Sequence, residues 1–233
     1  MAILARDNRR GALLSSREFS QIPCTDPGAL LSKLSGVPRI VFDLDGTLYD
    51  ARDFERPALM SVVEWLKVCT GRPLNGLLQS LWKRRETDRH RPGMFDELLV
   101  EFGLPAAWGS ECATRFREYA GTELLSVPTL RQELIALRSG NCGLALVSNG
   151  RPSLQQRKLE LLGLESIFDV CIFCDPEVPA QLKPSSWGWI QLEAWRSELP
   201  AAHVGDDPVD AGFAQEGAAQ FLHFAFRNPI YEH

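Results

Sequence analysis

The segment Arg39-Ile-Val-Phe-Asp43-Leu-Asp45-Gly46-Thr47-Leu48 places two carboxylates one residue apart, directly after an apolar run and before a Gly-Thr turn. The apolar run is typical of a short buried strand. A carboxylate at the end of such a strand is costly to bury unless a partner compensates its charge. Two carboxylates that converge there favour a hard cation bound through oxygen atoms. The segment therefore predicts a metal site at the end of a buried strand.

Three later segments place polar side chains in comparable positions, at a strand end or a helix start. They are Val147-Ser148-Asn149-Gly150, Lys183-Pro184 and Gly205-Asp206-Asp207-Pro-Val-Asp210. Each alone is weak evidence, because Ser, Asn and Asp commonly cap helices and a single lysine is usually solvated. Ligands of open parallel sheets bind outside the carboxyl ends of the strands. The order of paired aspartates, hydroxyl, lysine and clustered aspartates therefore predicts one shared site.

The combined set of side chains is complete for phosphoryl transfer. A carboxylate can attack phosphorus and form an aspartyl-phosphate. Mg²⁺ and a lysine would suppress the repulsion between the reacting anions. A serine hydroxyl and backbone N–H groups can hold phosphate oxygens. A second carboxylate can protonate the leaving oxygen and then deprotonate the attacking water.

The elements that must position these groups follow from the hydrophobic pattern. Strands are predicted at 39–43, 142–147, 168–173, 201–205 and 220–225, and helices between them at 128–139, 152–163, 184–197 and 208–217. This alternation favours a parallel sheet covered by helices on both faces. From about 53 to 125 the apolar residues recur at helical spacing without a convincing strand, which predicts a compact helical insertion.

Bulk composition excludes several classes of protein. The 233 residues are 45% hydrophobic and 24% charged, with a net charge of −5, which is ordinary for a globular protein and argues against a nucleic-acid binder. No apolar run reaches the roughly 18 residues that span a membrane, and the N-terminus lacks a signal-peptide core. Six scattered cysteines favour reduced thiols, so we expect a cytoplasmic protein.

The quoted segments resemble the four sequence motifs of the haloacid dehalogenase-like superfamily. Phe42-Asp43-Leu-Asp45-Gly46-Thr47-Leu48 looks like the first motif, Val147-Ser148-Asn149-Gly150 the second, Lys183-Pro184 the third and Gly205-Asp206-Asp207-Pro-Val-Asp210 the fourth. The stretch Gln156–Leu164, followed by Phe168-Asp169, is also similar to this superfamily. The resemblance covers roughly residues 39–226.

The resemblance implies a role for each matching residue. Asp43 would be the nucleophile and Asp45 the general acid and base. Mg²⁺ would be bound by the Asp43 carboxylate, the Asp45 carbonyl and Asp206. The phosphate would be bound by Ser148, Asn149 and Lys183, with supporting roles for Thr47, Gly150, Asp207 and Asp210.

The resemblance also implies the domain organisation. A Rossmann-like α/β core would comprise residues 38–52 and 126–233. An all-helical cap, a lid over the site, would be inserted after the first strand at 53–125. Residues 1–37 would form an N-terminal arm, poorly ordered or with one short helix, to which we assign no function.

The expected activity is Mg²⁺-dependent hydrolysis of a small phosphorylated metabolite. A sugar-phosphate mutase using the same core, or a non-catalytic partner-binding protein, stays an alternative. Dehalogenases of the superfamily typically lack the second aspartate of the first motif, so Asp45 argues against that activity. The basic segment Lys83–Arg91 is either a solvated helix face or a surface that orients an anionic substrate. The sequence identifies neither the substrate nor the oligomeric state.

Overall fold

The computed structural model describes residues 26, 28–88, 93–121, 124, 128–195, 201–228 and 231. Its centre is a five-stranded sheet in the order β3-β2-β1-β4-β5, and every neighbouring pair is parallel. The strands are β1 (Arg39–Phe42), β2 (Gly143–Asn149), β3 (Val170–Cys174), β4 (Ala201–Gly205) and β5 (Gln220–His223). The predicted α/β architecture is confirmed, with β1 at the centre of the sheet.

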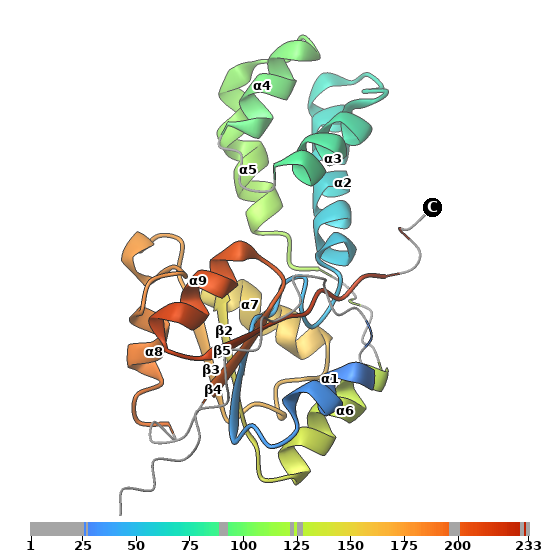
Figure 1. The fold of residues 1–233 in the computed structure, drawn as a ribbon. Helices are drawn as coiled ribbons and strands as arrows, with labels where there is room; N and C mark the ends of the chain where they lie inside the picture. The colour runs from blue at the N-terminus through green and yellow to red at the C-terminus, as the bar shows by residue number, and fades with distance from the viewer. Residues whose placement is uncertain are drawn as a thin grey trace, which may run out of the picture.

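Helices cover both faces of this sheet (Figure 1). One face packs against α1 (Gly28–Leu34), α6 (Pro128–Ser139) and α7 (Pro152–Leu161), and the other against α8 (Trp187–Gln191) and α9 (Pro208–Glu216). Within β1, Ile40 and Phe42 enter the first layer of the core, whereas Val41 enters the second. Because both faces are buried, the central strands read as continuous apolar runs rather than alternating ones.

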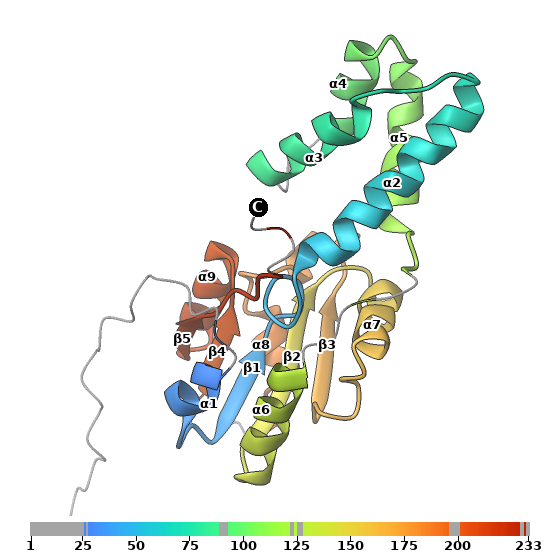
Figure 2. The same cartoon turned by 90° about the vertical axis from the view of Figure 1, so that its right-hand side faces the viewer.

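A bundle of helices stands beyond the carboxyl edge of the sheet (Figure 2). It consists of α2 (Ala51–Thr70), α3 (Leu77–Thr87), α4 (Met94–Glu101), the 3₁₀ turn η1 (Ala106–Trp108) and α5 (Gly109–Arg117). We call residues 51–117 the helical insertion. Its buried side chains form a hydrophobic cluster separate from those of the sheet, including Leu59, Val62, Leu66, Leu81, Leu98 and Cys112. The helical insertion therefore has a core of its own.

The chain enters the helical insertion through a fixed turn. Asp50 caps the first helix, because its side chain accepts a hydrogen bond from the backbone N–H of Arg52 at 3.0 Å. The Arg52 guanidinium also pairs with this carboxylate. The backbone N–H of Asn228, from the segment after β5, donates to Asp50 at 2.7 Å. The start of α2 is thereby tied to the C-terminal end of the sheet.

One predicted helix is shorter than expected. The sequence predicts a single helix over 184–197, but among the described residues 184–195 only Trp187–Gln191 is helical, preceded by the 3₁₀ turn η2 (Pro179–Gln181). Gly188 disfavours a longer helix. A Cβ atom at Gly188 would lie 2.9 Å from Val147, so this short helix is pressed against the sheet. The remaining predicted helices and strands of the core are confirmed within a few residues at their ends.

Other expectations have mixed outcomes. The short helix near residues 27–35 is confirmed as α1, whereas the rest of the N-terminal arm lies outside the described residues. The cysteines at 69, 112, 142, 171 and 174 are all free thiols. Cys171 and Cys174 lie on β3, and burial raises the pKa of each to about 11. None of the described helices has the length and apolar character needed to cross a lipid bilayer.

Candidate active site

The register of the sheet brings three motif segments to one edge. Phe42 pairs with Leu146 of β2 and with Val204 of β4. The next residue, Asp43, donates its backbone N–H to Val204 at 2.9 Å. Ser148 lies two residues beyond Leu146, and Asp206 lies two residues beyond Val204. The carboxyl ends of the three central strands therefore deliver these side chains to the same place.

Lys183 is a buried cation at this edge. Its Nζ atom lies 2.5 Å from Asp43 Oδ1 and 2.6 Å from Asp210 Oδ1, and its side chain is only 3% exposed. Burial opposes the charge, but Asp43 and Asp210 outweigh it and raise the pKa of Lys183 above its usual range. The lysine therefore stays protonated and bridges the two carboxylates.

Asp210 is held from a second side by His203. The imidazole Nε2 lies 3.1 Å from Asp210 Oδ1 and must be the donor, because a carboxylate only accepts. Burial lowers the pKa of His203, which favours the neutral ring. Although burial acts against ionisation of Asp210, Lys183 and His203 keep the pKa of this carboxyl below its usual range. Asp210 is thus an ionised partner of Lys183.

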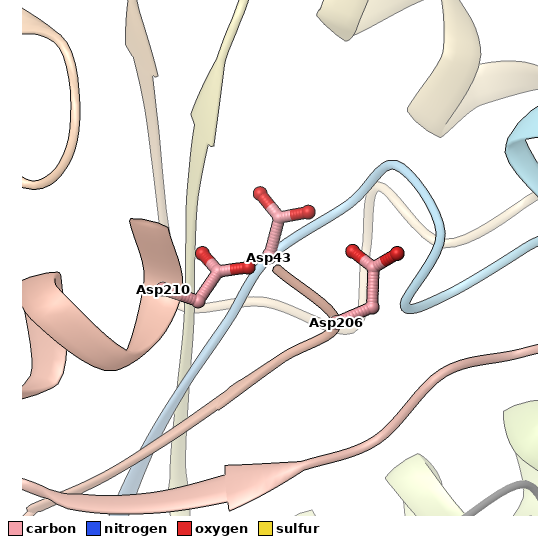
Figure 3. Close-up of side chains that lie close together, drawn as sticks. All are labelled: Asp43, Asp206 and Asp210. Atoms are coloured by element: carbon pink, nitrogen blue, oxygen red, sulfur yellow. The ribbon is translucent and has the colours of Figure 1, made fainter. Parts of the chain in front are cut away.

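Asp43, Asp206 and Asp210 form a cluster that offers oxygen atoms to a cation (Figure 3). One oxygen atom from each of the three lies within 4.8 Å of the others. Lys183 contacts both Asp43 and Asp210, but Asp210 is also held by His203, so Asp43 and Asp206 are the pair best placed for a metal ion. Burial raises the pKa of Asp43 to about 8, with Lys183 acting against this and the neighbouring carboxylates adding to it. A cluster of oxygen ligands with surplus negative charge fits Mg²⁺.

The turn after β1 is shaped to admit Asp206. Gly46 has a φ of 85°, and a Cβ atom there would clash with the Asp206 carboxylate. The next residue, Thr47, is fully buried, and its Oγ1 has no hydrogen-bond partner among the residues described. At position 46 glycine is therefore required both by the left-handed backbone and by the close approach of the Asp206 carboxylate.

The second motif fixes the position of the third. The side chain of Asn149 donates to the Lys183 carbonyl at 3.3 Å and accepts the Lys183 backbone N–H at 2.8 Å. A Cβ atom at Gly150 would clash with the Gln155 side chain. Ser148 is buried, and its Oγ accepts a hydrogen bond from Gln155 at 2.8 Å. The amide of Asn149 thus orients the segment that carries Lys183.

Asp45 occupies a separate set of contacts. Lys158 Nζ lies 2.7 Å from Asp45 Oδ1, Gln155 Nε2 lies 2.7 Å from Asp45 Oδ2, and the hydroxyl of Tyr49 also donates to this carboxylate. Burial acts to raise the pKa of Asp45. The charge of Lys158 and the three hydrogen bonds outweigh burial and lower the pKa to about 2.

Gln155 and Lys158 are not among the residues that the sequence predicts for the site. The two residues lie one turn apart on α7. Both are buried although they are polar, and each is next to a leucine in the sequence. That pattern, two polar residues at spacing i, i+3 facing the core, is the signal that could have found them. Lys158 also lies 4.5 Å from the ring centroid of Phe54, at the start of the helical insertion.

Asp207 has a structural contact that explains its position. Its side chain accepts the Val209 backbone N–H at 2.9 Å, and its own N–H donates to Asp210 at 3.2 Å. This reciprocal pair is a capping box at the start of α9. The cap also fixes the backbone from which Asp210 reaches Lys183.

A cavity of about 280 Å³ opens from this edge toward the helical insertion. The sheet side contributes five aspartates together with other polar side chains. Among them are Asp43, Asp45, Asp206, Asp207, Asp210, Ser148, Lys158 and Lys183. The helical insertion contributes Phe54, Glu55, Arg85, Phe116 and Arg117. The site is therefore bounded by charged groups on both sides.

The basic segment of α3 divides in the structure. Arg84 pairs with Glu97 at 2.7 Å and with Glu101, on the outside of the helical insertion. Its neighbour Arg85 lines the cavity. Residues 89–91 lie outside the described part of the chain. Arg84 therefore agrees with the interpretation of this segment as a solvated helix face. Arg85 agrees with the alternative, a surface that orients an anionic substrate.

Known proteins share this fold. The structure of a Thermotoga maritima protein assigned as a β-phosphoglucomutase superposes with a TM-score of 0.60 at 18% identity. The superposition covers 83% of this chain and 89% of that one. The HAD-hydrolase YfnB of Bacillus subtilis, described as bound to magnesium, gives 0.55 at 20% identity, with 79% and 87% covered. A subfamily IA hydrolase of Geobacter sulfurreducens gives 0.55 at 21% identity, with 79% and 85% covered. At these identities the likeness concerns the fold alone.

Sequence comparison is more specific. The chain is 28% identical over 143 residues to the glyceraldehyde 3-phosphate phosphatase of Pyrococcus abyssi, which is 59% of this chain and 60% of that protein. The chain therefore spans about 60% of the length of this curated relative. The family model described as haloacid dehalogenase-like hydrolase matches residues 37–217, which is most of the chain and includes every motif residue named above. The chain belongs to the haloacid dehalogenase-like hydrolase family.

Proposed function

We propose that the protein is a Mg²⁺-dependent phosphatase that hydrolyses a small phosphomonoester through an aspartyl-phosphate on Asp43. The observation that carries the proposal is the position of Asp43, between the buried cation Lys183 and the second carboxylate Asp206. The phosphatase activity of the curated relative from Pyrococcus abyssi supports the same reaction class.

In the first step, a carboxylate oxygen of Asp43 attacks phosphorus and the bond from phosphorus to the leaving oxygen breaks. Lys183, which is already charged and within 2.5 Å of Asp43, stabilises negative charge on the phosphoryl oxygens. The Ser148 hydroxyl lies at the same sheet edge and can hydrogen-bond a phosphoryl oxygen. A bound Mg²⁺, held by Asp43 and Asp206, would offset the repulsion between the carboxylate and the phosphate.

Asp45 supplies and removes the protons. In the first step the leaving oxygen takes a proton from Asp45, and in the second Asp45 takes a proton from the water that attacks the aspartyl-phosphate. A pKa of about 2 suits the second task, because the carboxylate is ionised. An incoming phosphate dianion raises the pKa of a neighbouring carboxyl. Substrate binding therefore favours the protonated acid that the first step needs.

The helical insertion acts as a lid in this proposal. Its wall closes one side of the cavity that holds the motif residues, and α2 connects to the core through the turn that carries Asp45 and Tyr49. Closing such a lid over bound substrate would exclude water other than the hydrolytic one. The residues of its wall would then select the leaving group.

The test is release of inorganic phosphate from p-nitrophenyl phosphate and a panel of phosphorylated metabolites. Wild-type protein should be active with Mg²⁺ and inactive after chelation with EDTA, and Asp43→Asn should lose activity by about 10³-fold or more, as removal of a nucleophile usually does. The matched control is Asp169→Asn, a carboxylate on the far side of the core that pairs with Arg138. Substantial activity in Asp43→Asn would rule out the aspartyl-phosphate. Transfer between positions of a sugar phosphate without phosphate release would instead indicate the mutase.

A further inference from the structure

The wall that the helical insertion presents to the cavity is positively charged and aromatic. Arg85 comes from α3 and Arg117 from the last turn of α5, and the rings of Phe54 and Phe116 line the same cavity. Arg151, at the start of α7, lines the cavity from the core. These guanidinium groups belong to neither the nucleophile nor the metal cluster, so the hydrolysis step leaves them without a role.

Arg85 is held in a fixed orientation. Its Nη2 donates to Glu55 Oε1 at 2.8 Å, and its guanidinium lies 5.3 Å from the centroid of the Phe116 ring. Both members of the ion pair are largely buried, with side chains 19% and 13% exposed. The Arg85 Nε is also buried and has no hydrogen-bond partner in the described ranges. Arg85 is therefore a preorganised donor whose charge Glu55 balances.

Arg151 is similarly balanced by carboxylates. Its guanidinium pairs with Glu177 at 2.8 Å and with Glu118 at 3.4 Å. Arg117 differs from both arginines. Its side chain is exposed at the cavity and makes no ion pair or hydrogen bond within the part of the chain that the structure describes. Arginine keeps its charge at every physiological pH and offers up to five N–H donors. Arg117 thus adds an unbalanced positive charge to the cavity wall.

We propose that the substrate carries a second anionic group, a carboxylate or a phosphate, and that Arg117 binds it with help from Arg85. This inference rests on the proposed phosphatase function. Asp43, Ser148 and Lys183 fix the transferred phosphoryl group at the sheet edge, so the rest of the substrate extends toward the helical insertion. There a guanidinium can bind an oxyanion through two parallel hydrogen bonds. The carbon chain between the two anions would lie against Phe54 and Phe116.

The cavity wall is unsuited to a phosphomonoester whose leaving group is uncharged. A substrate with an uncharged leaving group would leave Arg117 without a counter-ion inside the closed cavity, which is costly when water is excluded. A substrate with a second oxyanion removes that cost and adds a charge-assisted contact. The substrate should therefore be a phosphorylated acid or a bisphosphate rather than a phosphorylated aldehyde, alcohol or neutral sugar.

The experiment compares substrates that differ only in the second charge. One pair is 3-phosphoglycerate and glycerol 3-phosphate, and the other is the bisphosphate and monophosphate of propane-1,3-diol. We expect kcat/KM to favour the doubly charged member of at least one pair by about 10- to 100-fold, the value of one or two charge-assisted hydrogen bonds. The pair that shows the preference identifies the second anion as a carboxylate or a phosphate. In Arg117→Gln the ratio within that pair should collapse toward 1.

The control variant is Arg115→Gln on the same helix. Arg115 pairs with Glu111 at 2.8 Å and lies 4.6 Å from the Trp65 ring centroid, and it does not line the cavity. It should therefore keep the wild-type ratio. Equal kcat/KM within both pairs in the wild type, or an equal fall of the ratio in Arg115→Gln, would overturn the inference while the phosphatase stands. Absence of Mg²⁺-dependent hydrolysis of p-nitrophenyl phosphate would overturn the proposed function itself.

Discussion

Lys158 Nζ lies 2.7 Å from Asp45 Oδ1, and this ion pair joins helix α7 to the turn that follows the central strand. The pair is well shielded, with side chains 8% and 27% exposed. The Phe54 ring covers the same ammonium group from the first helix of the insertion. One cation therefore contacts both the proposed acid–base residue and the base of the proposed lid.

Replacing this lysine should destabilise the protein in a pH-dependent way. Lys158→Met keeps most of the side-chain volume but leaves the Asp45 carboxylate without its cation, so we expect a loss of about 1–3 kcal/mol at pH 7. The folded-state pKa of Asp45 is lowered to about 2, so the stabilisation by the pair is fully present above the unfolded-state pKa and is lost as the pH falls through about 2. In the variant the unpaired Asp45 can take up a proton as the pH falls. Urea denaturation should therefore show a smaller difference at pH 4 than at pH 7.

The control for this experiment is Lys67→Met on α2. Lys67 pairs with Glu64 at 2.6 Å, but the two side chains are 41% and 66% exposed. Exposed pairs contribute about 0–1 kcal/mol, so the loss in this variant should be small at both pH values. An equal loss in Lys158→Met at both pH values would mean that Lys158 acts through packing and not through its charge on Asp45.

Binding of Mg²⁺ should raise the melting temperature through Asp206. A ligand that binds only the folded state stabilises it by about 2.7 kcal/mol at a hundred times its dissociation constant. Asp206→Asn should abolish most of this Mg²⁺-dependent increase. Asp207→Asn is the matched control, because asparagine also caps helices and the Asp207 side chain is engaged at the start of α9. If both variants lose the response to the same extent, the metal is not specific to Asp206.

Gly46→Ala should weaken Mg²⁺ binding beyond its effect on folding. The residue has a φ of 85°, and an added Cβ atom would push against the Asp206 carboxylate. Gly36→Ala provides the control, since Gly36 has a φ of 80° and an added Cβ atom would meet nothing within 4 Å. Both variants should lose about 1–2 kcal/mol from the left-handed backbone. Only Gly46→Ala should also lower the Mg²⁺ affinity measured by calorimetry, and an unchanged affinity would show that Asp206 adjusts freely.

The sequence predicts the parts of this protein that depend on short-range patterns. The strand that ends directly before Asp43 and the helix that starts after Asp207 are confirmed because an apolar run and a helix cap are local features. The contacts of Asp45 were not predictable in the same way. Lys158 meets Asp45 across 113 positions of the chain, and only the packing of α7 beneath the sheet edge brings them together. The helix predicted over 184–197 is shorter in the structure because it contains Gly188, which disfavours helix formation.

The cavity wall shows the same limit. The cluster Lys83–Arg91 could be read as a basic surface from the sequence, but helix periodicity alone does not tell which arginine faces the core. In the structure Arg84 pairs with glutamates on α4, whereas Arg85, one position on, lines the cavity with Phe116. A rotation of about 100° per residue along a helix separates the two faces. The position of the neighbouring helices decides which face is functional.

Mg²⁺ binding should release a proton at neutral pH. The pKa of Asp43 is raised to about 8, chiefly by burial and with Lys183 in opposition, so this carboxyl is largely protonated at pH 6.5. A divalent cation favours the ionised form and lowers the pKa, so binding at pH 6.5 must displace the proton. The Mg²⁺ affinity should therefore rise as the pH increases from 6 to 8 and level off above about 8. Calorimetry in buffers of different ionisation enthalpy should detect proton release at pH 6.5 and less release at pH 9. In Asp43→Asn the proton release and the pH dependence should both disappear. Release that persists in this variant would place the displaced proton on another group of the cluster.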